Sequence, residues 1–180
     1  MRFEIIVAAA LAALAVAGPA RAELVSATPA TFLVRAEADV SAAPSQAYVA
    51  ITQPRRWWSS AHTYSGDAAN LRLTPRAGGC WCETWDHGQS VEHMRVVAVI
   101  EHEGVRTIRL AGGLGPLQEM GVNAVMTLTV TPREGGSKVT MTYRVAGEPG
   151  LALDQVAAPV DAVLMEQFGR LTRLLDGGAP

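Results

Sequence analysis

The last stretch of the chain, residues 153–176, constrains the fold more than any other segment. Its apolar side chains recur at steps of three and four residues, as they do in a helix with one apolar stripe. The residues of this stripe are Val156, Val160, Val163, Leu164, Phe168, Leu171, Leu174 and Leu175. Charged residues fall mostly on the opposite side, so we predict one long amphipathic helix.

The ends of this helix set its reach. Gly177 and Gly178 stop it, and Pro159 either opens it at its first position or kinks a longer helix. Counted from Pro159 alone, the helix would be about 25 Å long at roughly 1.5 Å per residue. That is about the width of five β-strands at a spacing of roughly 4.8 Å. The helix can therefore lie across a whole small sheet, which the preceding residues must supply.

The preceding residues alternate in the manner of strands. Residues 32–41 are predicted to form a half-buried strand. Two short helical segments follow: one is opened by Pro44, and the other, a helix or turn, begins with Arg55-Arg56-Trp57-Trp58. From Asn70 onward, about six short strands are separated by turn residues. Because strands and helices are segregated, we predict an α+β fold with a curved antiparallel sheet of about seven strands.

The first 22 residues have the pattern of a secretory signal peptide. Arg2 precedes an apolar run over residues 5–17, and Ala20-Arg21-Ala22 forms a cleavage site with small residues. The run is shorter than the roughly 20 residues that span a bilayer. We therefore expect a periplasmic or secreted protein with no stable membrane anchor after cleavage. In order, we expect an extended leader at 23–31, one domain at 32–176 and a tail at 177–180.

Size and charge narrow the classes of function. Cleavage would leave 158 residues (180 minus 22), enough for a single domain. Removing Arg2, Arg21 and Glu4 from the totals of 15 basic and 17 acidic residues leaves 13 and 16, a net charge of about −3. A slightly negative net charge gives no indication of the basic surface that binding to nucleic acid requires. No phosphate loop, dinucleotide fingerprint or nucleophile elbow is present, so we expect no cofactor. We also expect a monomer or weak dimer.

The order of elements resembles the START-like, or SRPBCC, superfamily with its helix-grip fold over residues 32–176. Four motifs are similar to an exported bacterial branch of that superfamily: Trp57-Trp58 and residues 62–71 (HTYSGDAANL), 78–83 (GGCWCE) and 90–94 (SVEHM). More distantly, the chain resembles polyketide cyclases and co-chaperones that activate an ATPase. The resemblance implies a cavity under the long helix that holds lipids, sterols, polyketides or aromatic compounds, with chemistry that depends on its lining.

The side chains available for such a lining favour a hydrophobic or aromatic small molecule as partner. Tryptophan and methionine suit a malleable apolar pocket, although each methionine alone could simply fill a gap in the core. The predicted ligand-binding residues are Trp57, Trp58, His62, Tyr64, Trp81, Glu83, Trp85, Met94, Met120, Met126, Met141, Tyr143, Val160, Leu164 and Phe168. The protein is therefore expected to be a binding protein.

Glu83 stands between Trp81 and Trp85 on one face of a predicted strand. If that face points inward, desolvation would raise the pKa of the carboxyl group, which could act as proton donor, base or hydrogen-bond anchor. If it points outward, Glu83 is a surface charge. An enzyme that uses Glu83 with His62 or His93 as acid and base is thus the alternative function. A co-chaperone fits poorly with export, because ATP is absent outside the cell.

Cys80 and Cys82 share the other face of this strand. In a regular strand their Cα atoms would be about 6.6 Å apart, so a disulfide requires an irregular strand. Otherwise they are two thiols in an oxidising compartment, which favours burial. The length of the next hairpin loop places His93 opposite either Cys82 or Glu83. The set Cys80, Cys82, His93 and His62 matches no established zinc signature, and no metal site is predicted.

Overall fold

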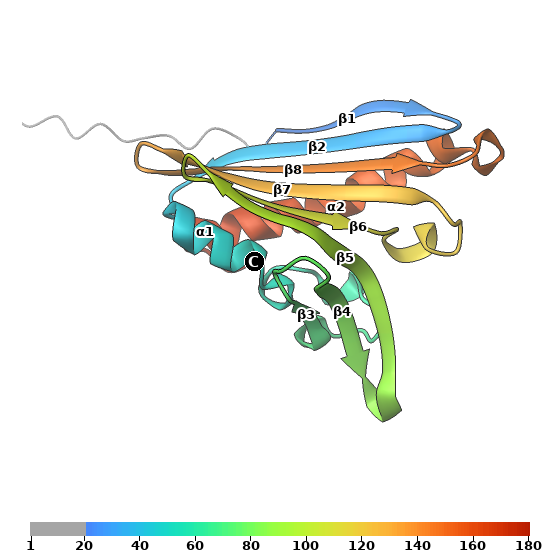
Figure 1. Cartoon of the computed structure of the whole chain (residues 1–180), viewed down its shortest axis with the longest axis horizontal. Coiled ribbons are helices and arrows are strands. Elements are labelled where there is room, and N and C mark those ends of the chain that lie inside the picture. Colours follow the sequence, from blue (N-terminus) through green and yellow to red (C-terminus); the bar gives the residue numbers. More distant parts are fainter. Residues whose placement is uncertain (1–20) are drawn as a thin grey trace, which may run out of the picture.

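Residues 21–180, which the computed structural model describes, form one eight-stranded antiparallel sheet with a long helix along it (Figure 1). The expected signal peptide lies outside the described residues, apart from its last two positions. The elements are β1 (Arg21–Thr28), β2 (Thr31–Val40), α1 (Pro44–Ile51), η1 (Pro54–Arg56), η2 (Ser60–His62), η3 (Ala68–Asn70), β3 (Leu71–Leu73), β4 (Cys80–Trp85), η4 (Asp86–Gly88), β5 (Gln89–His102), β6 (Val105–Ala111), η5 (Gly115–Leu117), β7 (Asn123–Arg133), β8 (Gly136–Ala146), η6 (Pro149–Leu151) and α2 (Leu153–Leu175).

The strands lie in the order β1-β2-β8-β7-β6-β5-β4-β3, and each neighbouring pair is antiparallel. Alternation decides which side chains face the core: Leu128 of β7 pairs with Met141 of β8, and both are buried. The predicted α+β class and antiparallel sheet are confirmed. The eighth strand is β1, which occupies most of the stretch expected to be an extended leader.

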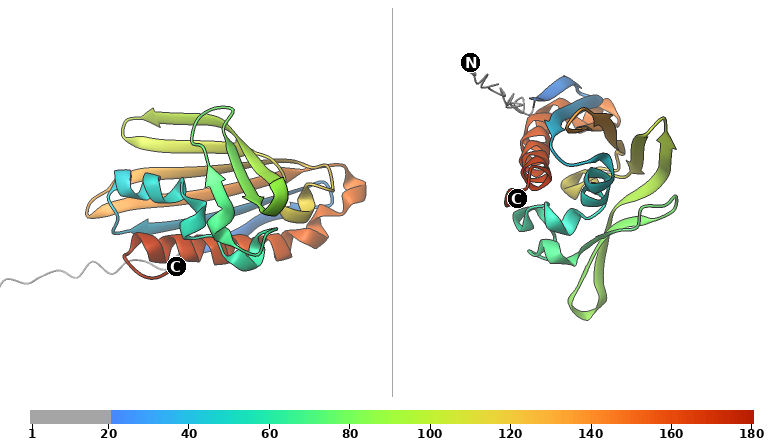
Figure 2. Two further views of the ribbon diagram at one scale, coloured as in Figure 1. Left: turned by 90° about the horizontal axis from the view of Figure 1, so that it is seen from below. Right: turned by 90° about the vertical axis from the view of Figure 1, so that its left-hand side faces the viewer.

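The long helix α2 runs beside β1 and β2 and contacts α1. Figure 2 shows the sheet curving from β1, next to α2, round to the hairpin of β4 and β5. Leu164, Phe168 and Leu171 of α2 are each at most 2% exposed. The apolar stripe of the helix therefore faces the concave side of the sheet, as its periodicity predicts.

A proline inside α2 and a hydrogen-bonded aspartate at its C-terminal end mark this helix. Pro159 lies inside the helix, and the carbonyl that it leaves without a helical donor belongs to Gln155. Both residues are exposed, so water can satisfy that carbonyl. At the far end, Asp176 Oδ1 accepts hydrogen bonds from Ser41 N at 2.8 Å and from Ser41 Oγ at 3.2 Å. This contact ties the last turn of α2 to the connection between β2 and α1.

Of the two short helical segments predicted after the first long strand, α1 is a regular helix and η1 is a single turn. Pro44 is the first residue of α1, where its missing N–H is harmless. Ala47 and Ile51 bury one edge of α1 in the core. Among residues 21–180, neither α-helix combines the length and the apolar character that a membrane span requires.

Replacing Phe168 with alanine should lower the free energy of unfolding by about 3–5 kcal/mol, because the buried ring leaves a cavity under α2. Gln155→Ala, at an exposed position of the same helix, is the matched control and should change it by less than about 0.5 kcal/mol. Urea unfolding followed by circular dichroism measures both. Equal effects of the two substitutions would contradict a helix held through its apolar stripe.

Candidate functional site

A fully buried carboxylate, that of Glu83 on β4, lies at the centre of the candidate site. Its Oε1 accepts a hydrogen bond from Ser65 N at 2.5 Å, and its Oε2 accepts one from Tyr64 N at 3.0 Å. His93 Nε2, on β5, lies 3.0 Å from the same Oε2. Both oxygens are thus occupied, and these bonds tie the loop between η2 and η3 to two strands of the sheet.

The protonation states follow from these contacts. Burial raises the pKa of Glu83, but the hydrogen bonds from Ser65, Tyr64 and His93 lower it by more, so the pKa lies below its ordinary value. The expectation of a raised pKa is therefore wrong in direction. Burial also lowers the pKa of His93, although Glu83 opposes this. At neutral pH the carboxylate is ionised and the imidazole neutral, and because a carboxylate only accepts, Nε2 carries the proton.

A β-bulge turns His93 toward this carboxylate. Trp81 pairs with Met94, and Cys82 pairs with Glu92, so His93 is the extra residue of β5 between the two pairs. Neighbours in a regular strand face opposite sides of the sheet, yet His93 and Met94 are both buried, at 6% and 1% exposed. The expectation that His93 lies opposite Cys82 or Glu83 is therefore wrong, because Cys82 pairs with Glu92 and Glu83 pairs with Val91. The imidazole reaches Glu83 from the bulge instead.

Across from the bulge, Cys80 and Cys82 form a disulfide with their Cα atoms 5.4 Å apart. A regular strand would separate these atoms by about 6.6 Å. Strand β4 is therefore contracted at the point where β5 carries its extra residue, which meets the condition that a bridge needs an irregular strand. Glu92 lies near both sulfur atoms, but sulfur atoms bonded to each other offer no thiolate to a metal.

Two tyrosines hold the loop that follows β6. Tyr143 OH accepts a hydrogen bond from Leu114 N at 3.0 Å, and Tyr64 OH donates one to Gly115 O at 3.3 Å. Tyr143 is fully buried, and burial raises its pKa far above the ordinary value, so it stays protonated. Tyr64 is 50% exposed, with its ring centre 5.8 Å from that of His93. Tyr64 therefore forms the outer layer of the site.

Three tryptophan rings pack against one another beside the buried carboxylate. The ring centres of Trp57 and Trp58 are 5.5 Å apart, and those of Trp58 and Trp81 are 5.0 Å apart. Trp57 Nε1 donates to Ala50 O at 3.0 Å, and Trp58 Nε1 donates to His62 O at 2.8 Å. Trp81 Nε1 is buried and has no hydrogen-bond partner among residues 21–180. We call these three residues the tryptophan cluster.

Helix α2 adds Gln167, which is fully buried. Its Oε1 accepts a hydrogen bond from Ser59 N at 2.6 Å, and Arg170 Nε donates to Trp57 O at 2.8 Å. These two bonds hold the segment between η1 and η2 against α2. Gln167 Nε2 is buried and, within the described chain, has no partner either. Sequence reasoning missed this residue, although a polar side chain among the apolar positions of a helix is a signal that could have found it.

The remaining predicted residues fall into different environments. His62 lies away from Glu83, with its Nε2 3.0 Å from Glu166 Oε2, so the structure brings His93 but not His62 to the carboxylate. The disulfide and these pairings also disperse the four side chains considered for a metal. Three of the predicted residues are half-buried: Trp85, Met120 and Val160. Five others belong to the buried core: Met94, Met126, Met141, Leu164 and Phe168.

Glu83→Gln should lower the free energy of unfolding at pH 7 by about 1–3 kcal/mol, because an amide accepts at only one of its two positions. The lowered folded-state pKa also means that stability is present above the unfolded value of about 4.3 and is lost as the pH falls through the folded value. Acid should therefore destabilise the wild type more steeply than this variant. Urea unfolding between about pH 7 and pH 3 measures both effects.

The control for this substitution is Glu119→Gln, which removes an exposed carboxylate. It should change the free energy of unfolding by less than about 0.5 kcal/mol and leave its pH dependence as in the wild type. Parallel pH profiles for the wild type and Glu83→Gln would contradict a structural role of the ionised carboxylate.

Serine at both Cys80 and Cys82 should lower the free energy of unfolding by roughly 1–2 kcal/mol, because the closed loop is short. Hydrogen exchange at the Tyr64 and Ser65 amides should accelerate, because β4 can then relax and the bulge loses its support. Mass spectrometry of exchange measures this, with the amides of β7 as the unaffected reference. Unchanged exchange at both amides would show that the disulfide does not support the loop between η2 and η3.

No protein-family model matches the chain, and no curated protein matches its sequence. Solved structures do match. A protein of Mesorhizobium loti is 20% identical with a TM-score of 0.54, over 81% of this chain and 97% of that one. Norcoclaurine synthase from Thalictrum flavum, in complex with dopamine and hydroxybenzaldehyde, is 13% identical with a TM-score of 0.51, over 80% and 86%.

A third similar structure is the di-domain ARO/CYC StfQ from the steffimycin biosynthetic pathway, which is 15% identical with a TM-score of 0.52. The match covers 84% of this chain and 51% of that one. At such identities the likeness shows the fold alone. Together with the curved antiparallel sheet and the long terminal helix, it shows that the chain has a helix-grip fold, which is the fold that the resemblance to the SRPBCC, or START-like, superfamily predicted.

Proposed function

We propose that this protein binds a small hydrophobic or aromatic molecule between α2 and the tryptophan cluster, and that the ligand carries a hydrogen-bond acceptor. The observation that carries the proposal is the pair of buried donors without a partner among residues 21–180, Trp81 Nε1 and Gln167 Nε2. Leaving such a donor unsatisfied costs about 1–3 kcal/mol, so native proteins keep few of them. A carbonyl oxygen on a bound ligand would offset that cost.

The two donors lie on either side of the region between α2 and the tryptophan cluster, which we call the ligand layer. Gln167 binds Ser59, the residue after Trp58, and the ring of Trp58 packs against that of Trp81. The third buried polar side-chain atom without a partner in the described chain is an acceptor, Asp161 Oδ1. It lies six residues before Gln167, which is about 120° around the helix, and therefore on another flank.

The named neighbours support this class of ligand. One is an ARO/CYC protein of the steffimycin pathway, and another holds dopamine and hydroxybenzaldehyde. In this chain, aromatic side chains flank the same region from two elements, Trp81 on β4 and Tyr64 on the loop over His93. A lipid, isoprenoid or polyketide-like compound with one carbonyl group therefore suits the layer.

An enzyme with acid and base groups is the weaker candidate. Both oxygens of Glu83 hold the loop in place, and its lowered pKa keeps it from delivering a proton at neutral pH. His62, the other candidate, pairs with Glu166 on α2. The polar pair of Glu83 and His93 is therefore better suited to shaping the site than to catalysis.

The proposal includes a location outside the cytoplasm. Its support is the signal-peptide pattern of residues 1–22 and the disulfide between Cys80 and Cys82, because disulfides persist in oxidising compartments. Such a location would suit a carrier of poorly soluble molecules.

The proposal is tested with a panel of lipids, isoprenoids and aromatic carbonyl compounds, by native mass spectrometry and quenching of tryptophan fluorescence. Trp81→Phe keeps an aromatic ring but removes the N–H donor, and should weaken binding of a carbonyl ligand by about 2- to 10-fold. Trp85→Phe, a half-buried position on the same strand, should leave the affinity unchanged. Failure of the wild type to bind any compound, or an equal loss in both variants, would contradict the proposal.

A further inference from the structure

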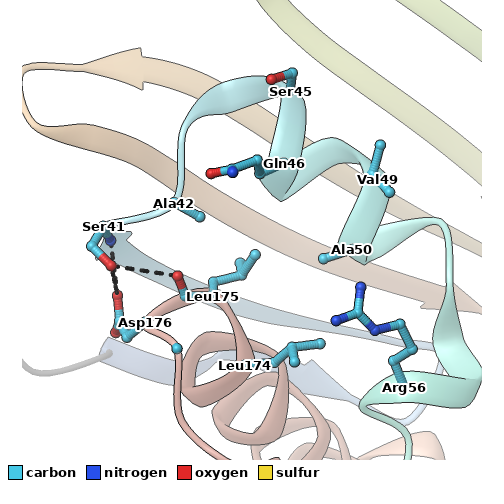
Figure 3. A pocket seen from close by; sticks show the side chains of 11 residues that line it. Ser41, Ala42, Ser45, Gln46, Val49, Ala50, Arg56, Leu174, Leu175 and Asp176 are labelled. Carbon is cyan, nitrogen blue, oxygen red and sulfur yellow. Dashed lines mark hydrogen bonds between the residues drawn. The ribbon is translucent and has the colours of Figure 1, made fainter.

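A groove of about 610 Å³ separates α1 from the last turn of α2 (Figure 3). Its volume lies within the roughly 300–1,000 Å³ of small-molecule sites. The apolar side chains that line it are Ala42, Val49, Ala50, Leu174 and Leu175. None of the residues of the tryptophan cluster lines it, nor does Gln167, so the groove is separate from the ligand layer proposed above.

Two acceptor groups of the groove already serve the fold. Asp176 Oδ1 accepts two hydrogen bonds from Ser41, at 2.8 and 3.2 Å. Gln46 Oε1 accepts one from Ala43 N at 3.2 Å, at the start of α1. The bonds from Ser41 hold the last turn of α2 against the connection that follows β2, and the bond from Ala43 N caps the start of α1. The charged group that remains for a ligand is a cation, Arg56.

Arg56 lies at the end of the groove away from Asp176, with its guanidinium turned toward Ala50 (Figure 3). Its backbone is fixed, because Arg56 N donates to Gln53 O at 2.9 Å and the next residue, Trp57, is buried. Within residues 21–180 its guanidinium has no carboxylate partner. A planar guanidinium with free N–H groups can bind a carboxylate through two parallel hydrogen bonds.

We propose that this groove binds a carboxylate with an apolar chain, such as a medium-chain fatty acid. The carboxylate pairs with Arg56, and the chain lies over Ala50, Leu174 and Leu175. Both parts are required, because an exposed ion pair alone contributes little to affinity. Burial of the chain adds a favourable contribution for each CH₂ group that leaves water. The charge complementarity at Arg56 selects the acid over a neutral lipid.

Decanoate is the probe for this site, and decanol is its neutral counterpart. Isothermal titration calorimetry on the full chain should show that Arg56→Gln weakens decanoate binding by about two- to fivefold, because the side chain of Arg56 is exposed and water screens its ion pair with the carboxylate. Arg55→Gln makes the same charge change at an exposed neighbour that does not line the groove, and should have no effect. Decanol should bind the wild type about as weakly as decanoate binds Arg56→Gln.

Several outcomes would overturn the proposal. Equal weakening by the two arginine variants would indicate general attraction to positive charge, and equal affinity for decanol and decanoate would remove the role of the ion pair. Trp81→Phe should leave decanoate binding intact, so a loss there would place decanoate in the ligand layer instead. Dimerisation that depends on concentration and is abolished by Arg56→Gln would assign the groove to a second copy. Circular dichroism is the check that the two arginine variants, which are changed at exposed positions, are folded.

Discussion

Burial of one face of α2 is the constraint on which the rest of the structure depends. The helix is long enough to run the length of β2, so the sheet must curve to cover its apolar stripe. Contacts on two sides then fix its position. Ser41 binds its last turn through Asp176, and Ser59 binds its middle through Gln167. Each contact joins residues more than 100 positions apart in the sequence. The segments before β3 therefore pack directly against the terminal helix.

The site is organised by a buried charge whose cost must be offset. A carboxylate in the interior is unfavourable unless donors surround it, and Glu83 obtains them from the loop amides of residues 64 and 65 and from His93. The imidazole reaches it only because β5 bulges, and β5 bulges where the disulfide contracts β4. Disulfide, bulge, imidazole and loop therefore form one connected arrangement.

Both proposed binding regions share a chemical asymmetry. The carboxylates of Glu83 and Asp176 are engaged in holding the fold together, whereas donors such as Trp81 Nε1 and the guanidinium of Arg56 have no partner of opposite kind within the described chain. If both proposals hold, apolar walls with unmatched donors would select molecules that carry oxygen acceptors on a hydrophobic body. The fold supplies the walls, and the unmatched donors supply the selectivity.

The sequence by itself determined the α+β class, the antiparallel sheet and the gripping helix, because the periods of 2 and 3.6 are local properties that report which face of a segment is buried. It did not reveal β1 as a strand, since its pairing depends on the free edge of β2. Only the tertiary structure decided that His93 faces Glu83 and that the pKa of Glu83 falls. A bulge arises from the pairing of two strands, and a pKa from groups that different segments bring together, so no local pattern encodes either.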